Sequence, residues 1–227
     1  MFKILFASLS ILFLCFVSSD FANAQVNLDS GLVAHFPFNG NALDMSGFNN
    51  HGTVLGPVLT EDRFQNPNSA YSFDGIDDQI KIEQYQNMSP TDAVSIVAWV
   101  KTESSLGAPP IYDRLQTNDG YGLRLDNSGN LRLTINGGIE DAISDREVDD
   151  GEWHCVIGTY DKLIGELNVY IDGDWWGSDN YSSSITYSPE PRNSIGAVGG
   201  SVPVYFEGLI DDLRAVSYTH LTLPTKA

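Results

Sequence analysis

The chain is poor in the residue types that several classes of protein depend on. It has 2 cysteines, Cys15 and Cys155, and Cys15 lies in a segment that we expect to be removed. The remaining chain then has no second thiol for an internal disulfide, and Cys155 is expected to be a small buried apolar residue. The 12 Lys and Arg are outnumbered by 30 Asp and Glu. A phosphate backbone is held by clustered cations, so this balance argues against nucleic acid as a partner.

Long helical periods and the motifs of common catalytic sites are also absent. The sequence contains no H-E-x-x-H, no G-x-S-x-G, no Gly-rich phosphate loop and no paired C-x-x-C. What it does contain is short apolar runs separated by Gly, Asn, Asp and Ser. This pattern of short strands and turn residues is typical of an all-β domain.

Both ends of the chain are predicted to lie outside the folded domain. Residues 1–24 combine one lysine, an apolar run too short to span a bilayer and a small-x-small ending, which is the pattern of a cleavable signal peptide. We therefore expect a secreted or cell-surface protein. Residues 216–227 resemble the translated read-through of a sequencing adapter, which leaves residues 25–215 as one domain that is cut short at its C-terminal end.

The stretch Gly151–Gly173 predicts a β-hairpin. Trp153–Tyr160 is dense in β-branched and aromatic residues, and Glu166–Ile171 alternates polar with apolar residues. The apolar residues of the second strand share one face, which another layer must cover. These residues are Leu167, Val169 and Ile171. Because the sequence offers strands rather than helices for that layer, we predict a two-sheet antiparallel β-sandwich.

Further strands are predicted along the chain. Ala93–Lys101 is the most apolar run and is expected to be a central strand. Asp74–Asp78 is expected to close one hairpin, and Tyr121–Leu125 with Leu131–Ile135 to form another. Residues 136–150 are expected to be mainly a rim loop, with a short strand around Ala142–Ile143 as an alternative, and residues 175–191 a loop region rich in Ser and Tyr. Short strands at regular spacing favour a jelly roll.

Six segments occur in an order that is characteristic of one group of β-sandwich domains. They read GLVAHFPFNGNALDMSGFNNHG, YSFDGIDDQIKI, VSIVAWVK, DGEWHCVIGTYD, LNVYIDG and FEGLIDDLR, and they extend from Gly31 to Arg214. This set resembles the laminin G-like, concanavalin A-like jelly-roll modules of secreted bacterial proteins. The resemblance implies that the first and last strands are neighbours. It also implies a non-catalytic module that binds glycans or proteins, often with calcium, and that is attached to further domains.

A structural calcium site is expected where the first and last strands meet. Asp44 and Asn50 lie in the loop after the first strand, and Asp211 and Asp212 lie near the end of the chain. Calcium takes six to eight oxygen ligands, which carboxylates and amides supply. A rival cluster is formed by Asp74, Asp77 and Asp78, although turn chemistry alone explains that sequence.

The adjacent residues Trp175 and Trp176 are the candidates for glycan binding. Neighbours on a strand point to opposite faces, so at least one of the two indoles is expected to be exposed, where it can stack on the C–H groups of a sugar. The alternative is that both pack under residues 182–187. Trp99 and Trp153 are interpreted as core. The supporting residues are Asp174, Asp179, Asn180 and Tyr181.

An enzymatic alternative rests on Glu147, Asp149 and Glu152. They match the E-x-D-x-x-E pattern of laminarinase-like glucanases, which need two carboxylates about 5 Å apart on a rigid strand. The intervening Asp150-Gly151 reads as a turn, so we expect these carboxylates to point into solvent. The sequence therefore favours a non-catalytic module for extracellular polysaccharide or glycoprotein glycans, with a glucanase and a structural spacer as alternatives.

Overall fold

The computed structural model describes residues 31–83, 86–116, 118–138, 140–188, 192–198 and 203–217. The predicted signal peptide, residues 1–24, lies outside these ranges, as do residues 218–227 of the predicted non-native tail. Within the described ranges, no helix has the length and apolar character needed to cross a membrane.

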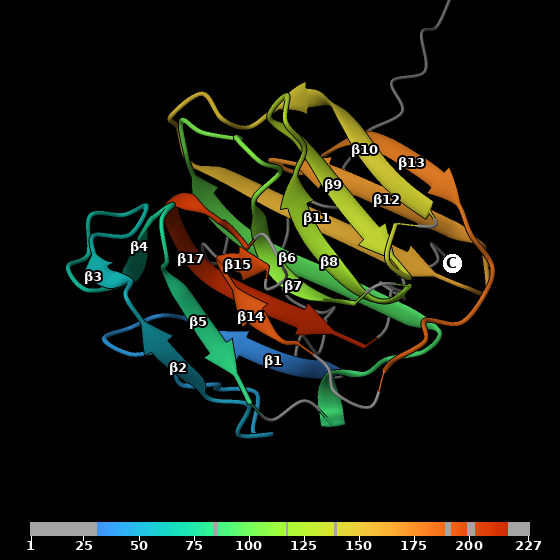
Figure 1. Ribbon diagram of the computed structural model, residues 1–227, viewed down its shortest axis with the longest axis horizontal. Coiled ribbons are helices and arrows are strands. Elements are labelled where there is room, and N and C mark those ends of the chain that lie inside the picture. Colours follow the sequence, from blue (N-terminus) through green and yellow to red (C-terminus); the bar gives the residue numbers. More distant parts are fainter. Residues whose placement is uncertain are drawn as a thin grey trace, which may run out of the picture.

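The chain forms two large antiparallel sheets that lie one behind the other (Figure 1). Sheet A has the order β13-β12-β11-β6-β17-β4-β3, and β1 pairs with β17. Its strands are β1 (Leu32–Phe36), β3 (Val58–Thr60), β4 (Ala70–Asp74), β6 (Ala93–Lys101), β11 (His154–Asp161), β12 (Glu166–Ile171), β13 (Asp174–Asn180) and β17 (Glu207–Val216).

Sheet B has the order β10-β9-β8-β7-β14-β5-β2. Its strands are β2 (Gly52–Leu55), β5 (Gln79–Ile82), β7 (Pro110–Gln116), β8 (Asp119–Leu125), β9 (Asn130–Ile135), β10 (Glu140–Glu147) and β14 (Ser194–Ile195). A small third sheet pairs β15 (Ala197–Val198) with β16 (Val204–Tyr205), and one 3-10 turn, η1, covers Gln86–Met88.

The core lies between the inner faces of the two sheets. Strand alternation places Leu167, Val169 and Ile171 of β12 in this core, where each is fully buried, as the sequence predicted. Leu123 of β8 and Leu133 of β9 join them from sheet B. Burial of each such side chain contributes about 1.5–3 kcal/mol, so the two-sheet contact dominates the stability of the fold.

Several predicted elements are confirmed. β11 and β12 form the hairpin expected from residues 151–173, and β8 and β9 form the second one. β6 covers the predicted central strand Ala93–Lys101 and lies between β11 and β17. The first and last strands are neighbours, because β1 pairs with β17 along Leu32–Phe36.

Three predicted elements are wrong. Asp74–Asp78 does not close a hairpin, because β4 belongs to sheet A and β5 to sheet B, so this turn carries the chain between the layers. Turn residues alone do not distinguish these two connections. The expected rim loop contains β10, which is longer than the short strand considered around Ala142–Ile143, and the expected loop after residue 174 begins with β13. Both are edge strands, whose polar residues face solvent and hide the strand pattern.

Candidate functional site

The outer face of sheet A carries an aromatic surface over β6, β11, β12 and β13. The strand register aligns Trp175, Tyr170, Ile157 and Val97 in one row. Residues directly opposite one another in a sheet point to the same side. The inward-facing neighbours of these residues, such as Val169 and Val156, are in the core, so the row faces away from the core.

A small apolar cluster supports this surface. Val97, Cys155 and Ile157 are buried outside the main core, and the half-buried rings of Trp99 and Tyr170 pack against them. Cys155 is fully buried, which confirms the prediction that it is a small apolar residue. We call the outward-facing rings of Trp99, Tyr170 and Trp175 the aromatic face.

Trp175 is the exposed member of the aromatic face. Its side chain is 57% exposed, and its indole Nε1 donates a hydrogen bond of 3.0 Å to Oδ1 of Asn168 on the neighbouring strand. This bond fixes the indole edge, while one large apolar surface stays in contact with solvent. A large exposed aromatic ring on a rigid strand is a common feature of binding sites.

The other two rings are held by polar neighbours. The Tyr170 hydroxyl forms a hydrogen bond with the Thr159 side chain, and burial raises the pKa of this hydroxyl. The guanidinium of Arg63 lies 4.7 Å from the ring centroid of Trp99 and also pairs with Asp211. Arg63 therefore links the aromatic face to the charged residues of β17.

The structure divides the predicted glycan-binding residues between the two sides of β13. Trp176 points inward, packs against the main core and lies under Arg146, whose guanidinium is 5.4 Å from its ring centroid. Tyr181 also packs against the core, and its hydroxyl accepts a hydrogen bond of 2.7 Å from Asn136. The prediction that the adjacent tryptophans face opposite sides is thus confirmed, and both Trp176 and Tyr181 pack on the core side.

The remaining predicted residues lie at the two ends of β13. Asp174 and Asp179 pair with the core residues Ile171 and Leu167, so they are on the inner side of the strand, whereas Asn180 pairs with Glu166 on the outer side. Asp174 and Asn180 are exposed at the two ends of β13, and Asp179 is half-buried beside Asn180. Sequence reasoning missed Asn168 and Tyr170, although the alternation of β12 places both opposite the buried Leu167 and Val169. The interpretation of Trp99 as core is wrong, because its strand neighbours Ala98 and Val100 occupy the core side.

The predicted calcium ligands take part in hydrogen bonds and ion pairs within the protein. Asp44 is 4% exposed, and its two oxygens accept hydrogen bonds from the backbone of His35, Ser46 and Asn50 and from the Ser46 hydroxyl. Asn50 donates its amide to the carbonyl of Val33. These bonds use both carboxylate oxygens of Asp44 to hold the loop after β1, which leaves little capacity for a metal.

Asp211 and Asp212 pair with cations instead. Burial raises the pKa of Asp211 to about 6, against the opposing charge of Arg63. Asp212 is half-buried; burial acts to raise its pKa, but its bonds with His35 and Arg214 outweigh this and lower the pKa to about 2. Within the described ranges, these two carboxylates do not join Asp44 in a group with ligand oxygens within 4.8 Å of one another.

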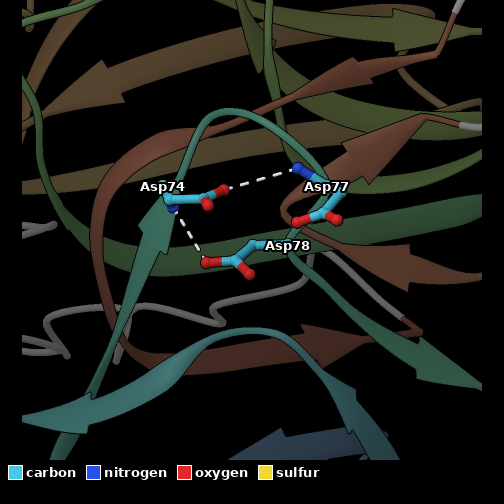
Figure 2. Close-up of side chains that lie close together, drawn as sticks. All are labelled: Asp74, Asp77 and Asp78. Carbon is cyan, nitrogen blue, oxygen red and sulfur yellow. Dashed lines mark hydrogen bonds between the residues drawn. The ribbon is translucent and has the colours of Figure 1, made fainter.

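The rival cluster is brought together by the structure. Figure 2 shows Asp74, Asp77 and Asp78 around the turn between β4 and β5, and their ligand oxygens lie within 4.8 Å of one another. Asp74 accepts bonds from the backbone of Ile76 and Asp77, and Asp78 accepts one from the backbone of Asp74. Burial, together with its two acidic neighbours, raises the pKa of Asp78. These hydrogen bonds are those of a turn, so turn formation alone accounts for the three carboxylates lying together.

The predicted glucanase carboxylates are not arranged on one strand. Glu147 is exposed at the end of β10, whereas Asp149 and Glu152 lie beyond that strand in the connection to β11. The backbone N–H of Glu152 donates to Asp150, which confirms the predicted turn. A retaining pair needs a fixed separation on a rigid support, and this segment does not provide that support.

Comparison with solved structures shows the same fold in binding domains of several proteins. The binding domain of Paraclostridial Mosquitocidal Protein 1 matches with a TM-score of 0.66 and 15% identity, covering 84% of this chain and 49% of that one. Botulinum neurotoxin type C, whose cell entry depends on interaction with two ganglioside molecules, matches with a TM-score of 0.64 and 18% identity. The match covers 86% of this chain and 50% of that one. The chain thus spans about half the length of these proteins.

A third similar structure is a single domain. Domain 4 of AbnA, an extracellular GH43 arabinanase from Geobacillus stearothermophilus, was solved in complex with arabinotriose. It matches with a TM-score of 0.59 and 20% identity, covering 82% of this chain and 92% of that one. At such identities the likeness concerns the fold. A comparison with curated proteins finds no match.

The family is established by a match that covers more than half of the chain. A model of the concanavalin A-like lectin/glucanases superfamily matches residues 74–222. This range contains strands of both sheets and the aromatic face. The two-sheet sandwich, the pairing of the first and last strands and this match together show that the chain belongs to the concanavalin A-like lectin/glucanases superfamily.

Proposed function

We propose that this domain is a non-catalytic glycan-binding module that uses the aromatic face of sheet A. The observation that carries the proposal is the exposed, oriented indole of Trp175, which lies beside Tyr170 and Asn168. The apolar C–H face of a sugar ring stacks on such an indole, and the adjacent hydroxyl and amide groups can bond the sugar hydroxyls.

The similar structures support this assignment. Domain 4 of the arabinanase was solved with arabinotriose, and a botulinum neurotoxin DC binding domain was solved with SialylT. The same sandwich therefore serves in proteins that bind saccharides. We further propose export to the cell surface or medium, on the basis of the predicted signal peptide, and attachment to other domains in the natural protein.

The test is a glycan array followed by titration calorimetry on the best-bound neutral glycan. We expect Trp175→Ala to lower affinity at least tenfold, since loss of one stacking ring removes much of the contact. The melting midpoint should change little, because the ring is exposed. The matched variant Trp176→Phe alters the adjacent tryptophan on the core side and should leave affinity unchanged. Equal affinity of wild type and Trp175→Ala would overturn the proposal.

The two alternatives predict different results. A glucanase would release reducing ends from laminarin, and this release would disappear in Glu147→Gln. A structural spacer would give no signal for any glycan on the array. The exposed position of Glu147 and the turn that follows it favour the binding module over the enzyme.

A further inference from the structure

Two parallel rows of residues cross the outer face of sheet A. The first, which we call the apolar row, is the aligned set Trp175, Tyr170, Ile157 and Val97. The second, which we call the polar row, is Ser178 on β13, Asn168 on β12, Thr159 on β11 and Ser95 on β6. On β12, β11 and β6 the members of the two rows are two residues apart, so both rows face outward.

The register of the strands fixes the dimensions of this surface. β13, β12, β11 and β6 are consecutive in sheet A (Figure 1), so each row spans three strand spacings, which is about 14 Å. The two rows lie two residues apart along the strands, which is about 7 Å. The surface therefore offers a long apolar strip with a strip of hydrogen-bonding groups beside it.

Two hydrogen bonds join the rows. The indole Nε1 of Trp175 donates to Oδ1 of Asn168 at 3.0 Å, and the Tyr170 hydroxyl bonds the Thr159 side chain. Each bond connects an aromatic ring of the apolar row to a member of the polar row. The rings and the polar groups are thus held in a fixed relative position before any ligand arrives, which lowers the ordering cost of binding.

The polar row can be reached from solvent. Ser178 is exposed, and Asn168, Thr159 and Ser95 are half-buried. Nδ2 of Asn168 has no hydrogen-bond partner within the described ranges, and it is not one of the fully buried polar atoms there. Its two N–H donors are therefore open to a ligand that lies beside Trp175.

Neither row contains a charged residue, although the chain has a formal net charge of −18. The charged residues next to the rows are mostly acidic. They are Glu166 and Asp161 beyond the polar row, Asp172 at the end of β12, and Arg214 at the β17 end, which is already bonded to Asp212. A ligand that fits both rows is therefore uncharged and carries hydroxyl groups along one edge.

We propose that this site binds a linear neutral polysaccharide whose chain runs across β13, β12, β11 and β6. The inference rests on the proposed glycan-binding function and adds the direction of the chain, its length and its polar contacts. Ser178 and Asn168 bond the sugar unit that stacks on Trp175, and Ser95 bonds the unit at the far end. A span of about 14 Å holds about three sugar units, because one unit is about as long as a strand spacing.

The first test is titration calorimetry of the whole chain with cello-, laminari- and xylo-oligosaccharides of two to six units. We expect at least one series to bind, with affinity that rises about tenfold or more from the disaccharide to the tetrasaccharide and then levels off. Affinity should not depend on salt, because screening acts on charges. Equal affinity for the disaccharide and the hexasaccharide, or no binding in any series, would overturn the inference.

Two variants test the direction of the chain. Ser95→Ala should weaken the tetrasaccharide about threefold to tenfold, as loss of one neutral hydrogen bond does, and leave the disaccharide unchanged. Glu166→Ala alters an exposed residue two positions along β12 from Asn168, and it should bind every length as the wild type does. Weaker binding by Glu166→Ala with wild-type binding by Ser95→Ala would mean that the chain follows the strands, which contradicts the proposed direction.

A third variant tests the polar contact beside Trp175. Asn168→Asp keeps an oxygen that accepts the indole N–H and removes the two amide donors, so it should weaken every length about tenfold. It also provides the test if Ser95→Ala folds poorly. Wild-type affinity in both Asn168→Asp and Ser95→Ala, with binding still lost in Trp175→Ala, would overturn this inference and leave the proposed function standing.

Discussion

At the scale of single residues, His154 connects the hairpin to the rest of the fold. It is 4% exposed, with Nδ1 2.8 Å from Oδ2 of Asp172 and Nε2 3.0 Å from Oδ1 of Asp150. Arg146 also pairs with Asp172, at 3.2 Å, and lies over the ring of Trp176. Since both ring nitrogens face carboxylates, the geometry favours the doubly protonated, charged imidazole.

This arrangement predicts a loss of stability at alkaline pH. The hydrogen bond with Asp172 raises the pKa of His154 above 6.5, and this outweighs the opposite effect of burial. The folded state therefore holds the proton more tightly than the unfolded state does. The associated stability is fully present below about pH 6.5 and is lost as pH rises through the folded pKa. Denaturant unfolding at a series of pH values measures this change.

The variant Asp172→Asn isolates the charge in this network. Asp172 has φ of 56°, which Asn tolerates, and an amide oxygen can still accept the backbone N–H of Cys155. We expect this variant to lose about 2 kcal/mol of unfolding free energy at pH 6, as for a hydrogen bond to a charged group. Its stability should then decline less toward pH 9 than that of the wild type. Asp174→Asn, an exposed neighbour, serves as the control. An unchanged pH dependence in Asp172→Asn would show that this carboxylate does not hold the proton of His154.

At the scale of elements, β13 decides how the aromatic face is presented. It is the edge strand of sheet A, yet it also approaches β10 of sheet B (Figure 1). Gly177 makes this approach possible, because a Cβ at this position would lie 2.1 Å from the carbonyl oxygen of Ile143. The neighbouring Trp175 and Trp176 then face solvent and core respectively.

We therefore expect Gly177→Ala to destabilise the domain by about 1–3 kcal/mol, as overpacking does. A Gly→Ala change without a clash would stabilise by about 0.4–1 kcal/mol, so the sign of the effect is diagnostic. Ser178→Ala, at an exposed position of the same strand, should change stability by less than about 0.5 kcal/mol. Urea unfolding gives both values. Higher stability of Gly177→Ala would contradict the close approach of β13 to β10.

Metal removal is expected to have little effect on stability. The carboxylates in the loop after β1, in β17 and at the β4–β5 turn are already bonded to backbone groups or cations, so we expect EDTA to move the melting midpoint by less than about 1 °C. A rise of the melting midpoint on addition of calcium would contradict this expectation, since a bound ion stabilises the folded state by mass action. Loss of such a rise in Asp77→Asn would place the ion at the β4–β5 turn, and loss in Asp44→Asn would place it at the loop after β1.

At the scale of the whole molecule, the sandwich offers two outer faces of different chemistry. Sheet A presents aromatic rings and sheet B presents arginines with buried acids. Both faces are built on rigid paired strands, which hold side chains more precisely than loops do. We expect the aromatic face of sheet A to favour the neutral faces of sugar rings.

Much of the fold could be predicted from the sequence. The alternation in Glu166–Ile171 and the apolar run Ala93–Lys101 specify strands because a buried face requires them. The partners of a turn could not be predicted in the same way. Asp74–Asp78 has the composition of a hairpin turn, and only the packing of the two layers sends β4 and β5 into different sheets.

The candidate site was predictable only in part. Strand alternation predicts that Trp175 and Trp176 face opposite sides, but it does not predict which of them faces solvent. The same alternation would have placed Trp99 and Tyr170 with Trp175, had the pairing of β6, β11 and β12 been known. The polar row joins residues from four strands, and no local pattern in the sequence connects them.

The central claim is that Trp175 on the outer face of sheet A contacts the glycan. The most direct measurement is an NMR titration of the four indole N–H signals with the neutral glycan that binds best on the array. We predict a large shift of the Trp175 signal, a smaller shift of Trp99 and none of Trp176. Shifts confined to Trp176 or Trp153, or binding without any change at Trp175, would contradict the account.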